Sequence, residues 1–200
     1  MVNIAVLFYS SSGTNHETAQ AVADGAAKAG AEVRVRRIGE TAPRAAIEAN
    51  PQWKQWVDEV APTIEEATLD DLEWGHGVAF GTPTRFGNAS SQMRSFIDTT
   101  GGLWAEGKLA DKTYTAFTSA MNPHGGNETT LLSLYTTFYH WGGVVVAPGY
   151  TDPVVFAAGG NPYGTSHATT QRNNPPGDEV LEAARHQGYR LADVTARLHA

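Results

Sequence analysis

The segment Ser10–Asn15 has the composition of a loop that binds an anion. It carries three consecutive serines and a glycine, and it lies between an apolar run and a helical pattern. Free backbone N–H groups at a helix start bind anions, and neighbouring hydroxyls add further donors. The segment lacks the Gly-x-Gly-x-x-Gly spacing of dinucleotide-binding loops and the lysine of nucleoside triphosphate loops. A single terminal phosphate therefore suits it, with an ordinary Ser/Thr cap of the following helix as the alternative.

Two further loops follow apolar runs and have a related composition. Gly81–Ser90 contains a proline that stiffens the turn, glycines that allow close backbone approach, and the aromatic Phe86. Such a loop can present N–H groups and an aromatic face to a flat heterocycle. A rigid turn that caps the next helix through Asn88 or Ser90 is the alternative. Ser119–Asn127 includes adjacent glycines before a helix and offers exposed amides in the same way.

Three single residues could also take part in chemistry, and each has a simpler interpretation. His124 could act as a base, although a lone loop histidine is more often a solvated hydrogen-bonding group. His140 ends a helical pattern, where a histidine interacts favourably with the helix C-terminus. Trp104 follows a helix stop, a position typical of a core residue or of a subunit contact.

The composition excludes several other functions. The chain has no cysteine, which removes disulfides, thiolate catalysis, zinc fingers and iron–sulfur clusters. Its 14 Lys and Arg against 21 Asp and Glu give a net charge of −7, which disfavours nucleic acid and anionic membranes as partners. The seven histidines are scattered without metal-ligand spacing, and no Gly-x-Ser-x-Gly nucleophile motif is present. Because the N-terminus lacks a basic signal segment and no apolar run reaches about 20 residues, we expect a cytoplasmic protein.

An alternation of strands and helices must position the three loops. Apolar runs predict buried strands, and a 3.6-residue periodicity predicts the helices between them. Five such strands predict a doubly wound α/β fold, in which helices cover both faces of a parallel sheet, with residues 1–200 in a single domain. The predicted strands are 4–9, 33–36, 76–81, 113–118 and 144–147, and the predicted helices are 16–29, 90–99, 129–140 and 178–198.

Two stretches fit this alternation less well. Residues 39–73 are interpreted as helical pieces in a long connection, and residues 149–176 as an irregular excursion. In a doubly wound sheet, ligands bind beyond the carboxyl ends of the strands. The three loops follow the first, third and fourth predicted strands, so we expect them to meet at that edge.

The second loop and the residues after it resemble the signature of a known family. Gly81–Asn88, followed by Gln92-Met93-Arg94-x-Phe96-x-Asp98-x-Thr100-Gly101-Gly102-Leu103-Trp104, is similar to the central motif of the WrbA family. The similarity runs from Met1 to Leu198. Members are flavodoxin-like NAD(P)H:quinone oxidoreductases that carry FMN and assemble as tetramers. The resemblance implies a five-stranded parallel sheet in the order 2-1-3-4-5, FMN as cofactor, NADH or NADPH as hydride donor, a small-molecule quinone as substrate, and a homotetramer.

The resemblance also assigns roles to individual residues. The first loop would hold the FMN phosphate, and the second and third loops would enclose the isoalloxazine ring. His140 would lie beside the flavin, and Trp104 from a neighbouring subunit would shape the quinone site together with Ser12. The implied cofactor-binding residues are Ser10, Ser11, Ser12, Gly13, Thr14, Asn15, Pro83, Thr84, Arg85, Phe86, Gly87, Asn88, Ser119, Ala120, Met121, Asn122, Pro123, His124, Gly125, Gly126 and His140.

The implied reaction is a two-electron, ping-pong reduction. A nicotinamide passes hydride to flavin N5, and a quinone then takes its place and is reduced to the quinol. Backbone amides or Arg85 would stabilise the negative charge of the reduced flavin near N1. Trp104 would stack against the flat quinone, and His140 or water would protonate the quinol oxygen.

Two departures from the family pattern concern the hydride donor and the substrate range more than FMN binding. Ser12 stands where members often carry an aromatic residue, and Met121–His124 replaces a Gly/Thr-rich stretch.

Three alternative functions stay open. The chain could be a flavodoxin-type electron carrier, a non-catalytic flavin-binding regulatory module, or a serine hydrolase that uses Ser11 or Ser12.

Overall fold

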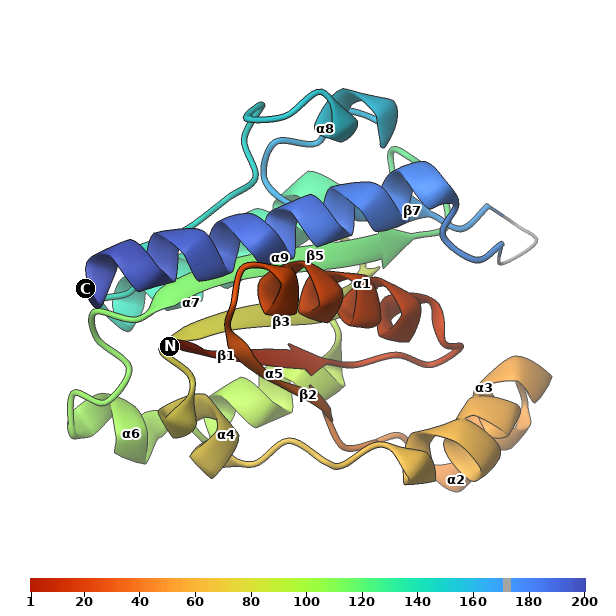
Figure 1. Cartoon of the computed structure of the whole chain (residues 1–200). Helices are drawn as coiled ribbons and strands as arrows, with labels where there is room; N and C mark the ends of the chain where they lie inside the picture. The colour runs from red at the N-terminus through yellow and green to blue at the C-terminus, as the bar shows by residue number, and fades with distance from the viewer. Residues whose placement is uncertain (171–173) are drawn as a thin grey trace.

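A parallel sheet forms the centre of the chain in a computed structural model that describes residues 1–170 and 174–200 (Figure 1). The main strands are β1 (Asn3–Phe8), β2 (Glu32–Arg37), β3 (Gly77–Arg85), β5 (Thr113–Ala120) and β6 (Val144–Val145). They lie in the order β2-β1-β3-β5-β6, and each neighbouring pair is parallel. Counted as the predicted strands, this order is 2-1-3-4-5, so the predicted topology is confirmed.

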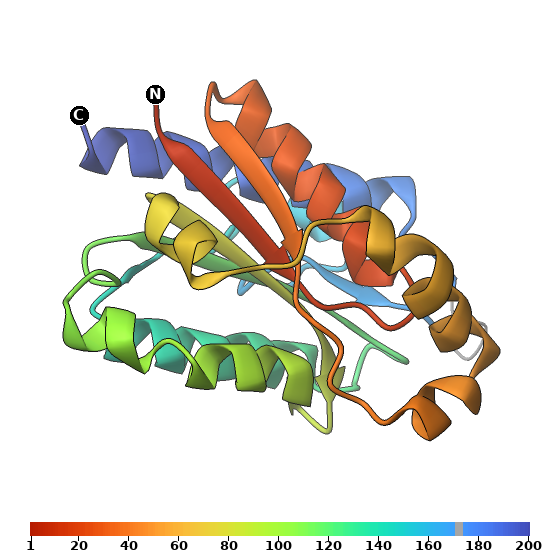
Figure 2. The same cartoon turned by 90° about the horizontal axis from the view of Figure 1, so that it is seen from below.

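Helices cover both faces of the sheet, as Figures 1 and 2 show together. One face carries α1 (Thr14–Lys28) and α9 (Asp178–Leu198), and the other carries α4 (Leu69–Trp74), α5 (Ser91–Asp98), α6 (Gly101–Ala105) and α7 (Asn127–His140). Val22 and Leu191 pack on the first face, and Met93 and Leu134 on the second. Because both faces are covered, β5 is buried along its whole length, as expected for a central parallel strand.

The two helices on the first face cross closely because glycines face the partner backbone. A Cβ atom built on Gly25 of α1 would collide with the backbone carbonyl of Arg185 in α9. A Cβ atom on Gly188 of α9 would collide with the carbonyl of Val22 in α1. Glycine in a helix interior costs about 1 kcal/mol relative to alanine, and here the close packing of the two helices offsets that cost.

The fifth strand of the sheet is interrupted, which corrects the prediction of a strand at 144–147 and of an irregular stretch at 149–176. The chain leaves the sheet after β6, forms the short helix α8 (Val154–Ala157) and returns as β7 (Ser166–Ala168). β6 pairs with the start of β5, and β7 pairs with its end. With β4 (Asn88–Ala89), the described residues form a seven-stranded sheet rather than one of five strands.

The side chain of Gln187 fills the gap between β6 and β7. Its Nε2 atom donates hydrogen bonds to the carbonyl of Ala116 (2.8 Å) and to Thr115 Oγ1 (2.7 Å) in β5. Its Oε1 atom accepts a hydrogen bond from the backbone N–H of Thr165 (2.7 Å). A buried amide of α9 therefore takes the place of the missing backbone ladder.

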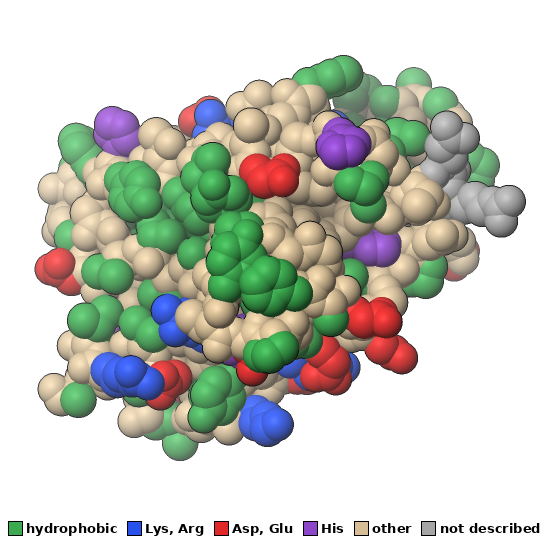
Figure 3. All heavy atoms as spheres, turned by 90° about the horizontal axis from the view of Figure 1, so that it is seen from above, with side chains coloured by type: hydrophobic (Ala, Val, Ile, Leu, Met, Phe, Trp, Pro, Cys, Tyr) green, Lys and Arg blue, Asp and Glu red, His purple; other side chains and the backbone are tan. Residues whose placement is uncertain are grey.

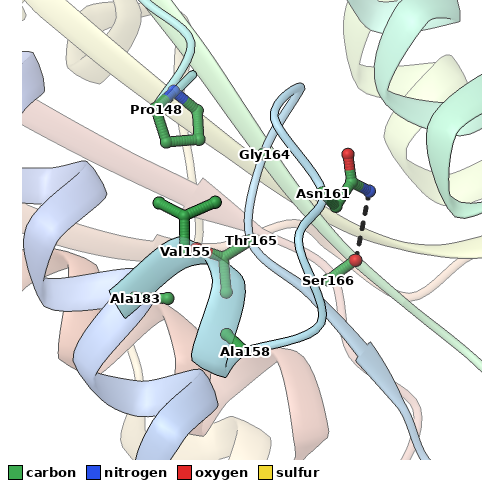
Figure 4. Close-up of a pocket in the computed structure, with 8 residues that line it drawn as sticks. All are labelled: Pro148, Val155, Ala158, Asn161, Gly164, Thr165, Ser166 and Ala183. Atoms are coloured by element: carbon green, nitrogen blue, oxygen red, sulfur yellow. Dashed lines mark hydrogen bonds between the residues drawn. The ribbon is translucent and has the colours of Figure 1, made fainter. Parts of the chain in front are cut away.

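The inserted segment lies against α9, as the close-up in Figure 4 shows. Val155 and Ala158 lie opposite Ala183 of α9 around a small cavity of about 10 Å³. Asn161 Nδ2 donates a hydrogen bond to Ser166 Oγ (3.1 Å), which ties the segment to β7. The inner side of the insertion is thus packed onto the rest of the domain.

The outer side of the same insertion is apolar. Tyr150 and Phe156 stack with ring centroids 4.7 Å apart, and both side chains are more than half exposed. In Figure 3, which views the molecule from the side of α8, hydrophobic side chains gather at the centre of this face.

No helix of the described residues combines the length and the apolar character needed to cross a bilayer.

β3 extends beyond the predicted strand 76–81 and forms a hairpin with β4. Thr84 pairs with Ala89, and Arg85 pairs with Asn88. Phe86 makes the turn with a left-handed backbone (φ 53°), and its side chain is fully exposed. The predicted loop Gly81–Ser90 is therefore largely a β-ribbon that projects from the sheet edge.

The long connection after β2 is helical, as predicted for residues 39–73. It contains α2 (Arg44–Glu48), α3 (Pro51–Gln55), the π-helical turn η1 (Trp56–Val60), the 3₁₀ turn η2 (Ala61–Thr63) and α4. Trp104 lies inside α6 rather than after a helix stop.

Candidate functional site

A cavity of about 550 Å³ opens at the carboxyl edge of the sheet. β1, β3 and β5 all end at this edge, and the loops that follow them contribute to the walls, as predicted. The wall residues are Ser11, Ser12, Thr14, Asn50, Gln52, Pro83, Thr84, Arg85, Phe86, Ser119, Ala120, Met121, Asn122, Gly125 and Thr169. The structure therefore brings together three segments that are far apart in the sequence.

The first loop leaves the start of α1 open. Gly13 is the N-cap residue with a φ of 94°, and among the described residues no side chain caps the helix. The N–H of Gly13 donates to Ser10 Oγ (3.0 Å), so Ser10 acts within the loop. A helix start without a side-chain cap has unpaired backbone N–H groups, and the helix dipole adds positive potential there. Together with the hydroxyls of Ser11 and Ser12, this end of α1 suits an anion.

Aromatic side chains support the first loop from behind. The ring of Trp56 lies 5.5 Å from the ring of His16 and 6.4 Å from that of Phe8. A Cβ atom built on Gly13 would lie 3.7 Å from Trp56, so the loop rests on this indole. Burial lowers the pKa of His16 below its ordinary value, which favours the neutral imidazole.

Two polar side chains beneath the first loop are buried. Asn15 Nδ2 donates to the carbonyl of Tyr9 (3.2 Å), while its Oδ1 atom has no hydrogen-bond partner among the described residues. Burial, followed by the hydrogen bond to the Glu40 carboxylate, raises the pKa of Tyr9 far above its ordinary value. Tyr9 is therefore a permanent hydrogen-bond donor at the end of β1.

The second and third loops contact each other through glycines and threonine hydroxyls. A Cβ atom built on Gly126 (φ 92°) would lie 2.7 Å from Gly87 Cα, so this approach requires glycine. Thr84 Oγ1 lies 2.6 Å from Thr130 Oγ1 and 3.4 Å from the carbonyl oxygen of Gly126. The two loops are thus held as adjacent walls of one cavity.

Arg85 carries the only charge among the wall residues that the structure describes. Its Nη1 atom donates to the carbonyl of Thr84 (3.0 Å), and no carboxylate of the described residues forms an ion pair with it. The remaining walls consist of neutral hydroxyls, amides and apolar groups. A ligand with one anionic group and a largely neutral body matches this distribution of charge.

Sequence reasoning did not assign three of the wall residues. Thr169 follows β7, and its N–H donates to the carbonyl of Ala120 (2.7 Å), which brings it to the rim of the cavity. Asn50 and Gln52 come from the start of α3. All three belong to stretches without clear periodicity, so only the folded chain places them at the site.

Several predicted site residues lie in the loops but not on the cavity walls. His124 is exposed, and its N–H donates to Asn122 Oδ1 (2.9 Å). The predicted residues that the wall does not include are Ser10, Gly13, Asn15, Gly87, Asn88, Pro123, His124, Gly126, Trp104 and His140. The loop residues in this set shape the turns around the cavity, through Ser10, Gly13, Gly87 and Gly126 in particular.

Trp104 and His140 lie together, away from this cavity. They line a separate hollow of about 260 Å³, and Trp104 Nε1 donates to the backbone carbonyl of His140 (3.2 Å). His140 ends α7, whereas the cavity lies at the start of α7, and a helix of 14 residues is about 20 Å long. Within one chain, neither residue therefore reaches the cavity.

No metal site is visible in the described part of the chain. No three His, Asp or Glu side chains lie close enough together to hold an ion there.

The sequence is similar to proteins of known class over its whole length. The profile of the NADPH-dependent FMN reductase family matches residues 2–160. A protein from Deinococcus radiodurans named NAD(P)H dehydrogenase (quinone) is 50% identical, over 98% of this chain and 97% of the relative. A protein of the same name from Nitrobacter winogradskyi is 43% identical and is matched over 100% of both chains.

Solved structures with the same architecture are flavodoxin-like. The crystal structure of a WrbA-like flavodoxin from Agrobacterium tumefaciens matches with a TM-score of 0.69 at 23% identity, over 98% of this chain and 99% of that chain. A flavodoxin from the domain Archaea matches with a TM-score of 0.62 at 18% identity, over 97% and 99% of the two chains. These likenesses confirm the flavodoxin-like fold.

Proposed function

Because this chain belongs to the NADPH-dependent FMN reductase family, we propose that it is an FMN-dependent NAD(P)H:quinone oxidoreductase. The predicted family resemblance is confirmed, and full-length relatives carry the name NAD(P)H dehydrogenase (quinone). NADH or NADPH would be the hydride donor, and a small-molecule quinone would be the acceptor.

One observation carries this proposal, namely an uncapped helix start beside a cavity with mostly neutral walls. The start of α1 offers backbone N–H groups and the hydroxyls of Ser11 and Ser12 to a phosphate. The cavity volume of about 550 Å³ lies within the usual range of cofactor sites, about 300–1,000 Å³. The buried Oδ1 atom of Asn15, which has no hydrogen-bond partner in the described part of the chain, lies in the same loop. The donor set and the walls therefore fit a flat ring with a phosphorylated tail.

The chain's own residues would bind the cofactor from three sides. Ser10–Asn15 would hold the phosphate through N–H groups and hydroxyls. Pro83–Asn88 and Ser119–Gly126 would hold the ring, since their contact through Gly87 and Gly126 fixes the distance between these two walls. Thr169 would complete the rim beside Ala120.

When bound, FMN would supply a two-electron carrier that takes hydride at N5 from a nicotinamide and passes it to a quinone in a ping-pong sequence. Arg85 and the amides before α7 would add positive potential near the ring, which favours negative charge there. Phe86, exposed on the hairpin turn, would cover the ring edge against water.

The proposed site is incomplete within one chain. Trp104 is more than half exposed and contacts His140, so a second copy could present both side chains together to the cavity of its neighbour. The imported Trp104 would stack against the quinone beside Ser12. His140 or water would then donate the proton to the quinol oxygen. This geometry is our reason to propose a homo-oligomer, with the tetramer of the resembling family as the expected state.

The visible absorption spectrum of the purified protein with FMN tests the proposal. We expect a bound-flavin spectrum that bleaches anaerobically with NADH or NADPH and recovers on addition of benzoquinone. Reductive titration in two separate one-electron steps, without quinone turnover, would favour a flavodoxin-type carrier instead. A colourless protein that takes up no FMN and cleaves an activated ester would point to a hydrolase that uses Ser11 or Ser12.

A further inference from the structure

A half-buried carboxylate behind the cavity joins three elements that shape it. Glu40 follows β2, and its Oε2 atom accepts hydrogen bonds from Tyr9 OH (2.8 Å) and Trp53 Nε1 (2.8 Å). Its Oε1 atom accepts a hydrogen bond from Gln92 Nε2 (2.7 Å). The donors come from the end of β1, from α3 and from α5, which are far apart in the sequence.

The same carboxylate also accepts two backbone N–H groups, from Thr41 (2.9 Å) and Ala42 (2.8 Å). Burial alone would raise the pKa of Glu40, but the hydrogen bonds from Ala42, Gln92 and the aromatic donors together hold this pKa below its ordinary value. A carboxylate has about four lone-pair positions, and five donors occupy them here. Glu40 therefore has no capacity left for a ligand, and its role is to hold the chain.

Each of the three elements leads directly to a wall of the cavity. Tyr9 immediately precedes the first loop, and Gln92 lies in α5, immediately after the hairpin of the second loop. α3 carries the wall residues Asn50 and Gln52. Displacement of the Glu40 carboxylate would therefore disturb several walls at once.

α3 depends on its hydrogen bond to the Glu40 carboxylate more than the end of β1 and α5 depend on theirs. None of its five residues is buried, so it has no apolar anchor of its own. Trp53 reaches Glu40 through the indole N–H, and the next buried anchor, Trp56, belongs to η1. Asn50 Oδ1 caps the helix by accepting from the N–H groups of Gln52 and Trp53, which fixes its shape but not its place on the domain.

We propose that Glu40 is a positioning residue that fixes α3 as one wall of the FMN cavity. It does not touch the cofactor, and it acts through Trp53 and through the wall residues that α3 carries. This inference rests on the proposed function, because FMN is taken as the occupant of the cavity.

Glu40→Gln tests this role with a nearly isosteric change. The new amide places an NH₂ donor where the carboxylate accepts hydrogen bonds, so at least one present donor loses its partner. We expect the dissociation constant of FMN, measured by quenching of flavin fluorescence, to rise about tenfold. Gln52→Ala should weaken FMN binding in the wild-type chain but add little to the effect of Glu40→Gln, because the wall is already displaced.

The matched control is Glu48→Gln in α2, within the same connection. Its carboxylate forms a surface ion pair with Arg44 (2.9 Å), and both side chains are about half exposed. We expect FMN affinity within twofold of the wild type, since exposed pairs contribute little. Trp53→Phe is the second test variant. It keeps an aromatic ring while it removes the indole donor and part of the ring volume, so it should reproduce the effect of Glu40→Gln even if that variant folds poorly.

Trypsin cleavage without FMN gives a readout that does not depend on the cofactor. Lys54 lies in α3, and release of this helix from the domain should expose the backbone near Lys54 to the protease. We expect cleavage after Lys54 to be several-fold faster in Glu40→Gln and Trp53→Phe than in the wild type and in Glu48→Gln.

The cleavage and FMN-binding results distinguish a failure of the role of Glu40 from a failure of the proposed function. Equal cleavage rates in all four proteins would overturn the role of Glu40, and so would unchanged FMN affinity in both test variants. A wild-type chain that binds no FMN would overturn the proposed function, while faster cleavage of the variants would still show that Glu40 holds α3.

Discussion

At the scale of single residues, Gly126 determines how close the second and third loops can come. Its positive φ of 92° is unfavourable for any residue with a Cβ atom, and that atom would lie 2.7 Å from Gly87 Cα. We expect Gly126→Ala to separate the two walls and to weaken FMN binding about 5- to 150-fold, from a strain of about 1–3 kcal/mol. A fluorescence titration with FMN measures this effect.

Gly102→Ala is the control for this change. Gly102 lies in α6, and a Cβ atom there would meet no atom within 4 Å. FMN affinity should stay at the wild-type value, and stability should stay equal or rise slightly because alanine favours helix. If Gly126→Ala binds FMN as tightly as Gly102→Ala does, the close approach of the loops is irrelevant to the site.

At the scale of elements, Gln187 replaces part of a strand. Gln187→Ala would leave the N–H of Thr165 and the carbonyl of Ala116 without their partner inside the domain. We expect the free energy of unfolding in urea to fall by about 2–4 kcal/mol, the usual cost of buried polar groups left unpaired together with a small cavity. β7 and the rim residue Thr169 should become mobile first.

Gln20→Ala provides the comparison for Gln187→Ala. Gln20 is exposed on α1, and its side chain contacts the ring of His16 at the surface (3.1 Å). Its loss should change stability by less than about 0.5 kcal/mol. A similar small change in Gln187→Ala would mean that water replaces the amide in the gap of the sheet.

The crossing of α1 and α9 leads to a second prediction about elements. Gly188→Ala directs a methyl group at the backbone carbonyl of Val22, and a backbone neighbour cannot move aside as a flexible side chain can. We expect a loss of about 3 kcal/mol or more in unfolding free energy, with a lower thermal midpoint. A thermal midpoint equal to that of the wild type would mean that the two helices can separate without loss of packing.

At the scale of the whole molecule, we propose that two chains share each site. His140→Ala and Trp104→Ala should slow quinone reduction while FMN affinity stays near the wild-type value, because both residues lie away from the cavity of their own chain. Steady-state rates with benzoquinone and FMN titrations, measured on the same samples, separate the two effects. A collapse of FMN affinity in either variant would place that residue in cofactor binding instead.

Mixed assemblies test the sharing of the site directly. Gly126→Ala damages the cavity, and Trp104→Ala damages the surface that a neighbour would present. Co-expression of the two variants should restore part of the quinone reductase activity, because some cavities then combine an intact pocket with an intact Trp104. Activity that only equals the average of the two separate variants would indicate sites formed within single chains.

Local patterns in the sequence were sufficient to predict much of the fold and of the candidate site. Apolar runs and helical periodicity located the five principal strands and the main helices, since burial between two layers leaves a direct mark on composition. The three loops were found by their glycines, hydroxyls and proline, because the carboxyl ends of parallel strands meet at one edge. The motif from Gly81 to Trp104 identified the family before any fold was known.

Other features followed only from contacts between distant segments. In the sequence, Gln187 is an ordinary helical glutamine and Glu40 an ordinary loop carboxylate. Only the fold places Gln187 beside β5 at the gap between β6 and β7, and only the fold brings three elements to Glu40. The cavity wall also includes Thr169, Asn50 and Gln52. Contacts of their segments with other parts of the fold bring these residues there. The resemblance assigned His140 to the flavin site and Trp104 to the quinone site of a neighbouring subunit, and the fold shows that within one chain both lie at the far end of α7 from the cavity.

Local sequence patterns thus determined the layers and the chemistry of the loops, because burial and turn geometry depend on neighbouring residues, while the strand order was implied by the family resemblance. The tertiary structure decided which polar side chains replace missing backbone partners, which helix contributes to the cavity wall, and which predicted residues lie away from the cavity of their own chain. Those features depend on distances between segments that the sequence separates by tens of residues, and such distances exist only once the chain has folded.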